Sequence, residues 1–234
     1  MISSKVIETL APLFNIISQS RGKTIKQLKE DLNIAKIMKK GASGLIVENI
    51  LGIKNNSRDE PDLPEIGCEI KCLPLQQNKN GDIKAKEPTA IQIINYCEVA
   101  KEKWETAKVR HKISLTFWVV YLAKQNNKAL NQDDYVIVDY YLDQPNAETD
   151  GIFKKDWEEI QAFIKRGDAD KLSCSMGIYL EPKTKGRNNK DVTDAPDGKG
   201  GKIKARRRAF YYKKNYTNKK IIPQLNLAVI RKQK

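Results

Sequence analysis

Four charged residues, among them Asp62, Glu69 and Lys71, interrupt an apolar stretch, PDLPEIGCEIKCLP, that otherwise has the composition of a buried strand. Side chains alternate between the two faces of a strand, so Glu69 and Lys71 point to the same side, with Cα atoms about 6.5 Å apart. Asp62 comes seven residues before Glu69, behind a turn that contains two prolines, and can fold back beside it. The spacing therefore predicts two carboxylates and one ammonium group at a common site.

Two carboxylates, together with water and a phosphate oxygen, form a ligand set that suits Mg²⁺. Such a metal activates water and offsets the charge that develops on a phosphodiester during hydrolysis. The alternative is an edge strand whose Glu and Lys form a surface ion pair. An acid, any residue and then Lys occurs four times in the chain, beginning at Glu69, Asp82, Glu181 and Asp197. Only the first of these has a Pro-Asp pair upstream, an apolar strand around it and a preceding acid, Glu48, within a predicted helix.

Basic residues exceed acidic ones along the chain: 43 Lys and Arg against 29 Asp and Glu give a net charge of +14. Most of the excess lies in residues 183–220, which hold 14 basic residues and three acidic ones. Towards the end of this segment basic side chains alternate with tyrosines, an arrangement that suits a nucleic-acid-binding face. A polyanion is therefore the expected partner. A merely solvated basic surface is the alternative.

The hydrophobic pattern predicts the elements that position these residues. Helices are expected over about residues 3–19, after a cap at Thr24, around Glu48 and over 154–168; strands are expected over 66–73, 113–122 and 134–143. An Asn-Gly pair at 80–81 indicates a hairpin turn after the first strand, and the polar segment 184–202 is expected to be disordered. Because strands and helices do not alternate strictly, the pattern favours a mixed sheet flanked by helices.

Composition limits the class further. The 40% of hydrophobic residues can bury a core, and no sharp break in composition divides residues 1–234, so one folded domain is expected, with two lobes left open. Four cysteines without a Cys-x-x-Cys pair and one histidine argue against a zinc site. Polar residues and a proline interrupt the apolar residues near the N-terminus, which predicts a cytoplasmic protein with no membrane segment.

The chain resembles the MutH family, which joins mismatch-repair nicking endonucleases to related type II restriction enzymes that cut at GATC. The resemblance rests on the motif GLIVENILG…PDLPEIGCEIKCLP and extends to GKTIKQLKEDL, IYLEPKTKG and RRRAFYYKKNYTNKKI, so it covers most of the chain. INYCEVAKEKWETA and KKDWEEIQAFIKRGDADKLS are closer to the restriction-enzyme branch. The resemblance implies an α/β fold with a restriction-endonuclease-like mixed sheet, flanking helices and a DNA-binding cleft.

The resemblance also implies roles for individual residues. Asp62 and Glu69 would hold a divalent metal, Mg²⁺, while Lys71 orients or activates the attacking water. Glu48 would complete the catalytic site.

In the later half of the chain the resemblance implies that Tyr211, after Phe210, and Lys183, after Pro182, contact the recognition bases. Where the repair enzymes have Arg before that proline, this chain has Glu181. Because Arg is the common bidentate reader of guanine, the recognition sequence stays open. The basic run adds further DNA-binding candidates: Arg206, Arg207, Arg208, Lys213 and Lys214.

The expected protein is a type II restriction endonuclease that hydrolyses double-stranded DNA at a short sequence with Mg²⁺. A transient or stable homodimer on DNA is left open. One alternative is a strand-nicking mismatch-repair endonuclease. A second alternative, from another class, is a basic nucleic-acid-binding protein without catalytic activity.

Overall fold

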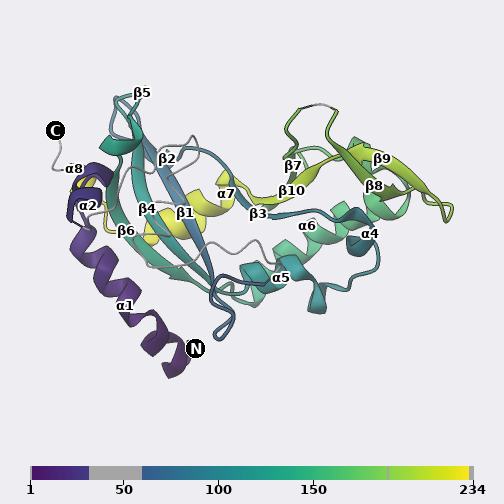
Figure 1. Cartoon of the computed structure of the whole chain (residues 1–234), viewed down its shortest axis with the longest axis horizontal. Coiled ribbons are helices and arrows are strands. Elements are labelled where there is room, and N and C mark those ends of the chain that lie inside the picture. The colour runs from purple at the N-terminus through teal and green to yellow at the C-terminus, as the bar shows by residue number, and fades with distance from the viewer. Residues whose placement is uncertain (1, 32–59, 189, 232–234) are drawn as a thin grey trace. The chain divides into compact units, whose positions relative to one another are not determined.

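The computed structural model describes residues 2–31, 60–188 and 190–231 (Figure 1). These residues form two compact units. The first unit comprises the described residues up to 87, residues 115–144 and the chain from 218 onward. The second unit comprises residues 88–114 and 145–217. The helix expected around Glu48 lies outside the described residues.

The first unit is built on a mixed sheet. Its strands are β1 (Glu69–Gln77), β2 (Ile83–Ala85), β4 (Thr116–Gln125), β5 (Lys128–Ala129) and β6 (Val136–Asp143). The order is β2-β1-β4-β5, and β6 also pairs with β4. Strands β1 and β4 run parallel, while the other pairs are antiparallel. The expected mixed sheet and the Asn-Gly hairpin between β1 and β2 are confirmed.

Helix α1 (Ser4–Ser20) covers the apolar face of this sheet (Figure 1). It begins where the Ser3 hydroxyl accepts a hydrogen bond from the Val6 N–H, and it buries Leu10, Leu13 and Ile17. The ring of Phe14 stacks on Tyr140 of β6, with centroids 5.1 Å apart. The other helical segments of the first unit are α2 (Ile25–Asp31), η2 (Gln132–Asp134), η5 (Ile222–Gln224) and α8 (Ala228–Arg231). Segment η4 (Thr217–Ile221) begins at the last residue of the second unit and continues into the first.

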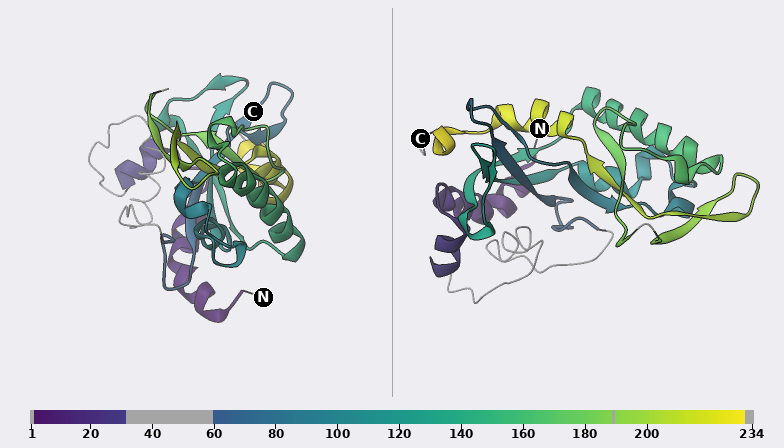
Figure 2. Two further views of the ribbon diagram at one scale, coloured as in Figure 1. Left: turned by 90° about the vertical axis from the view of Figure 1, so that its right-hand side faces the viewer. Right: turned by 90° about the horizontal axis from the view of Figure 1, so that it is seen from above.

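The second unit contains two antiparallel sheets. One has the order β3-β10-β7, with β3 at Thr89–Ile93, β10 at Arg208–Tyr212 and β7 at Leu180–Thr184. The other is a hairpin of β8 (Val192–Pro196) and β9 (Lys202–Arg206), which projects from the unit as an arm (Figure 2). The helical segments are α4 (Tyr96–Val99), η1 (Trp104–Thr106), α5 (Lys108–Ile113), α6 (Ala147–Lys165), η3 (Ala169–Lys171) and α7 (Lys214–Tyr216).

The hairpin overturns one expectation. The segment 184–202 was expected to be disordered, but its residues 192–196 pair in register with β9. The turn is stabilised locally, because the Asp197 carboxylate accepts hydrogen bonds from the N–H groups of Lys199 and Gly201. The polar composition that predicted disorder therefore supplies the side-chain bonds that close the turn.

A buried carboxylate fixes the start of β7. Asp156 of α6 is 4% exposed and accepts hydrogen bonds from the backbone N–H groups of Ile178, Tyr179 and Leu180, at 2.7 to 2.9 Å. One side chain thus satisfies three backbone donors, of which those of Tyr179 and Leu180 are buried. The position of β7 depends on this contact.

We expect Asp156→Ala to lower the free energy of unfolding by about 3 kcal/mol, because it leaves buried N–H groups without their acceptor. The matched control is Glu158→Ala on the exposed side of the same helix, which should change stability by less than about 0.5 kcal/mol. Urea titration followed by circular dichroism measures both. Equal stability of the two variants would contradict the anchoring role of Asp156.

Candidate active site and DNA-binding face

Glu69 and Lys71 form an ion pair within the first unit. Glu69 Oε1 lies 2.6 Å from Lys71 Nζ, and the two side chains are 3% and 17% exposed. Burying a carboxylate costs several kcal/mol unless it is paired and hydrogen-bonded. The alternative of a surface ion pair is therefore wrong, because both charged groups are largely removed from water.

The opposite face of β1 belongs to the hydrophobic core. Cys68 and Ile70 are buried against the residues of α1, and Cys72 packs against the same cluster. This alternation confirms the predicted separation of the two faces. Burial raises the pKa of the Cys68 thiol to about 12, and the carboxylates of Asp62 and Glu69 add to the rise. Cys68 therefore stays protonated at neutral pH and does not offer a thiolate ligand.

Asp62 returns to β1 as the sequence predicted. Its Oδ2 accepts a hydrogen bond of 2.9 Å from the N–H of Ile70. The intervening turn closes through two backbone hydrogen bonds between Leu63 and Cys68, and Gly67 takes the positive φ of 63° that the turn requires. The Asp62 carboxylate is thereby held at the strand position that follows Glu69.

The donor chemistry of this cluster fits a hard divalent cation. The carboxylates of Glu69, and of Asp62 bonded to the N–H of the residue after it, match the one or two protein ligands with which Mg²⁺ is usually held. Within residues 2–31, 60–188 and 190–231 no three His, Cys, Asp or Glu side chains converge as a metal site. The fit therefore rests on the two carboxylates and on the ammonium group beside them. Glu48, the third predicted acid, lies outside the described residues.

The predicted base-reading residues meet in the second unit. Tyr211 on β10 lies opposite Glu181 on β7, and Lys183 lies opposite Ala209, so these side chains share one face of the sheet. The ammonium nitrogen of Lys183 is 5.6 Å from the centroid of the Tyr211 ring, and that of Lys185 is 5.5 Å away. These are cation–π distances. Sequence reasoning missed Lys185, although it continues the alternation that begins at Glu181 and Lys183.

Glu181 is an unusual member of this face because it is only 5% exposed. Burial raises the pKa of its carboxyl, while the charges of Lys213 and Lys183 act in the opposite direction. Lys213 itself points into the loop before β7, where its ammonium group donates to the carbonyl oxygens of Ser175, Met176 and Gly177.

The three consecutive arginines lie in different surroundings. Arg206 is exposed and bonds the carboxylate of Asp170, with Nε 3.1 Å from Oδ1. Arg207 bonds Asp191, with Nε 3.0 Å from Oδ1. Arg208 is 4% exposed, and its guanidinium donates to the Asp170 carbonyl. Lys214 is exposed at the start of α7. Of the three arginines, Arg208 therefore has the least surface to offer DNA.

The mixed sheet flanked by helices is consistent with a restriction-endonuclease-like fold, and its strand β1 carries Glu69 and Lys71 with Asp62 bonded to it. Residues 51–156 match the model of a family described as DNA mismatch repair enzyme MutH. The chain is 30% identical over 214 residues to the DNA mismatch repair protein MutH of Shewanella woodyi, and the aligned residues cover 90% of each protein. It therefore belongs to the MutH-related family of DNA endonucleases.

Other relatives include both branches of this family. The type II restriction enzyme Sau3AI of Staphylococcus aureus is 33% identical over 213 residues, which cover 89% of this chain but 41% of that enzyme. The MutH protein of Actinobacillus pleuropneumoniae is 28% identical over 196 residues, 84% of each protein. The chain thus spans less than half of the Staphylococcus enzyme. No helix in the described parts of the chain is long and apolar enough to cross a membrane.

The raised pKa of Glu181 predicts a pH dependence. A carboxyl whose pKa is higher in the folded protein destabilises the fold progressively as the pH rises above its ordinary value of 4.5. Glu181→Gln should therefore gain stability relative to the native chain as the pH rises from 4 to 7. Glu159→Gln, on the exposed side of α6, is the control and should show no such trend. Thermal melting across this pH range measures both, and a trend of opposite sign for Glu181→Gln would contradict the assignment.

Proposed function

We propose that the protein is a type II restriction endonuclease that uses Mg²⁺ to hydrolyse phosphodiester bonds within a specific sequence of double-stranded DNA. The observation that carries the proposal is the buried Glu69–Lys71 pair on β1, with Asp62 bonded to the next N–H of that strand. Because the chain belongs to a family of DNA endonucleases, DNA is the expected substrate of this cluster. In a binding protein without catalytic activity, the cost of burying Glu69 would have no evident function.

In this proposal Asp62 and Glu69 are the metal ligands. Mg²⁺ bound by them would activate water and neutralise the charge that develops on the phosphate. Lys71 stays within 2.6 Å of Glu69 through their ion pair, so its ammonium group is a fixed donor that orients the attacking water. The Ile70 N–H keeps Asp62 in place through one of its oxygens. Glu48 would complete the site.

The DNA-binding role is assigned to the second unit. Lys183 and Tyr211 would contact base edges, because a cation and an aromatic ring lie together on one face of this sheet. Arg206, Arg207 and Lys214 would contact phosphates. Arg208 and Lys213, which bond backbone carbonyls, would act by positioning the strand and the loop before β7. We propose that both units act as one nuclease domain, and that a homodimer on DNA cuts both strands.

A nicking activity of the mismatch-repair type is the second candidate. It is favoured by the match to the Shewanella protein over 90% of both chains. The restriction activity is favoured by the slightly higher identity to the Staphylococcus enzyme, 33% against 30%. Incubation of the purified protein with supercoiled plasmid and Mg²⁺ separates the two. Linear fragments with defined ends support restriction, whereas open circles alone support nicking, and EDTA should abolish either product.

Conservative changes at the cluster should remove cleavage and leave DNA binding intact. Asp62→Asn, Glu69→Gln and Lys71→Met should each lower the rate of plasmid cleavage by at least about 100-fold, because metal and water positioning supply several kcal/mol to catalysis. The matched control is Asp82→Asn, which alters another acid-x-Lys triplet, at the exposed turn before β2.

The control should cleave at the native rate, and thermal melting checks that each variant is folded. Native cleavage by a folded Glu69→Gln variant would overturn the assignment of the active site.

A further inference from the structure

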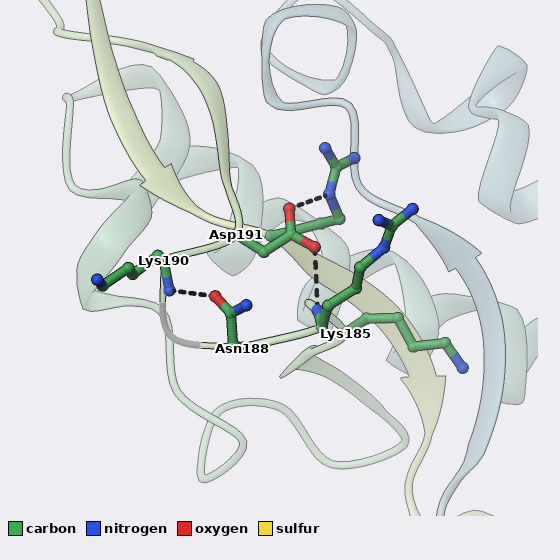
Figure 3. A pocket seen from close by; sticks show the side chains of 6 residues that line it. Lys185, Asn188, Lys190 and Asp191 are labelled. Carbon is green, nitrogen blue, oxygen red and sulfur yellow. Dashed lines mark hydrogen bonds and ion pairs between the residues drawn. The ribbon is translucent and has the colours of Figure 1, made fainter.

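A pocket of about 510 Å³ lies in the second unit, between the loop that joins β7 to β8 and the residue that joins β9 to β10 (Figure 3). The residues that line it are all charged or polar: Lys185, Arg187, Asn188, Lys190, Asp191 and Arg207. Four of them are cations and one is an anion. A lining without apolar side chains does not suit the largely hydrophobic ligands that most small-molecule pockets bind. Its composition favours an anion.

The single carboxylate of the pocket organises its cations. Asp191 Oδ1 accepts from Nε of Arg207, and its Oδ2 accepts from the backbone N–H of Arg187, both at 3.0 Å (Figure 3). Two backbone hydrogen bonds of 3.0 Å, from the Arg207 N–H to Asp191 and from the Lys185 N–H to Arg207, attach the loop to the β9–β10 junction. The hydrogen bonds that the Asp191 carboxylate accepts lower the pKa of its carboxyl; the bond from the Arg187 N–H has the larger effect and the bond from the Arg207 side chain the smaller. These bonds attach Lys185, Arg187 and Asp191 to the β9–β10 junction.

The other cations of the pocket are available to a ligand. Among the described residues, no acidic side chain forms an ion pair with Lys185, Arg187 or Lys190. Figure 3 shows the side chains of Lys185 and Lys190 extending to opposite sides of Asp191. Positive charges spread in this way suit successive phosphates of a chain better than one compact ion.

The pocket adjoins the base-reading face. Lys185 lines the pocket and also lies 5.5 Å from the ring of Tyr211. In duplex DNA a phosphate lies next to every base, so a protein that contacts a base edge also meets its neighbouring phosphates. Arg and Lys are the side chains that usually bind them.

We propose that this pocket binds the DNA backbone at phosphates next to the nucleotide that Tyr211 contacts, with Lys185, Arg187, Lys190 and Arg207 as the phosphate-binding groups. The inference rests on the proposed function and adds a binding site that fixes the register of the duplex. Asp191 has a positioning role, because it holds Arg207 and the loop without contacting DNA.

The first experiment measures affinity for a random duplex as a function of salt. Arg187→Ala/Lys190→Ala should make the slope of log affinity against log salt concentration shallower by about two, since each lost phosphate contact removes about one. The matched control is Lys199→Ala/Lys202→Ala, which removes two exposed lysines from the adjoining β8–β9 arm, outside the pocket. The control should change the slope by less than about one. Equal slopes for the pocket variant and the native chain would overturn the proposal.

A second variant distinguishes a built site from a general positive field. Asp191→Ala removes a negative charge, so a simple basic patch would bind the random duplex more tightly. A pocket organised by Asp191 would bind it more weakly, and that is the result we expect. Tighter binding by a folded Asp191→Ala variant would contradict the proposal.

Binding of inorganic phosphate at matched ionic strength distinguishes a site for free phosphate from a site for the phosphates of DNA. Saturable phosphate binding to the native chain, together with unchanged DNA affinity of Arg187→Ala/Lys190→Ala, would show a free-anion site and overturn the proposal. Plasmid cleavage by the native chain is measured in parallel. If the native chain cleaves plasmid and the pocket variants bind DNA with native affinity, this inference alone is overturned. If the pocket variants bind DNA more weakly but the native chain does not cleave, the proposed function alone is overturned.

Discussion

The ion pair between the buried carboxylate of Glu69 and Lys71 is the interaction on which the candidate active site depends. A charge at that position in the sheet is tolerated because Lys71, two residues further on, places its ammonium group 2.6 Å away. At the next backbone position the Asp62 side chain accepts the N–H of Ile70, so both carboxylates are fixed by the same strand. The opposite face of this strand is packed beneath α1, which prevents the strand from shifting. A rigid and partly dehydrated pair of acids is the environment in which a cation and a water can be positioned accurately.

Charged side chains also organise the second unit through hydrogen bonds to the backbone. Asp156 accepts three N–H groups at the start of β7, and the ammonium group of Lys213 donates to three carbonyl groups of the loop before it. These contacts place Glu181 and Lys183 opposite Tyr211 and Ala209. At the base of the arm, the Asp191 carboxylate bonds both the side chain of Arg207 and the backbone N–H of Arg187. The positive charge of residues 183–220 therefore divides into side chains that hold the unit together and side chains that are available to DNA.

Local patterns in the sequence predict the features that depend on near neighbours. The two-residue period of β1 places Glu69 and Lys71 on one face, the Asn-Gly pair marks the hairpin, and the apolar spacing of α1 identifies the helix that covers the sheet. Features that depend on distant partners have no such signal. The pairing of Arg207 with Asp191 joins residues sixteen positions apart, and the three donors to Asp156 come from more than twenty positions away. Side-chain bonds within the turn at Asp197 also reverse the disorder that composition alone predicts for the arm.

The most direct test of the central claim is to locate the metal. Mn²⁺ is a hard cation that accepts carboxylate and water ligands as Mg²⁺ does, and its anomalous scattering identifies it in a crystal. Crystals of the native chain grown with Mn²⁺ should show an anomalous peak bonded to carboxylate oxygens of both Asp62 and Glu69. Mn²⁺ bound elsewhere in a protein that cleaves DNA, with neither carboxylate among its ligands, would contradict the account.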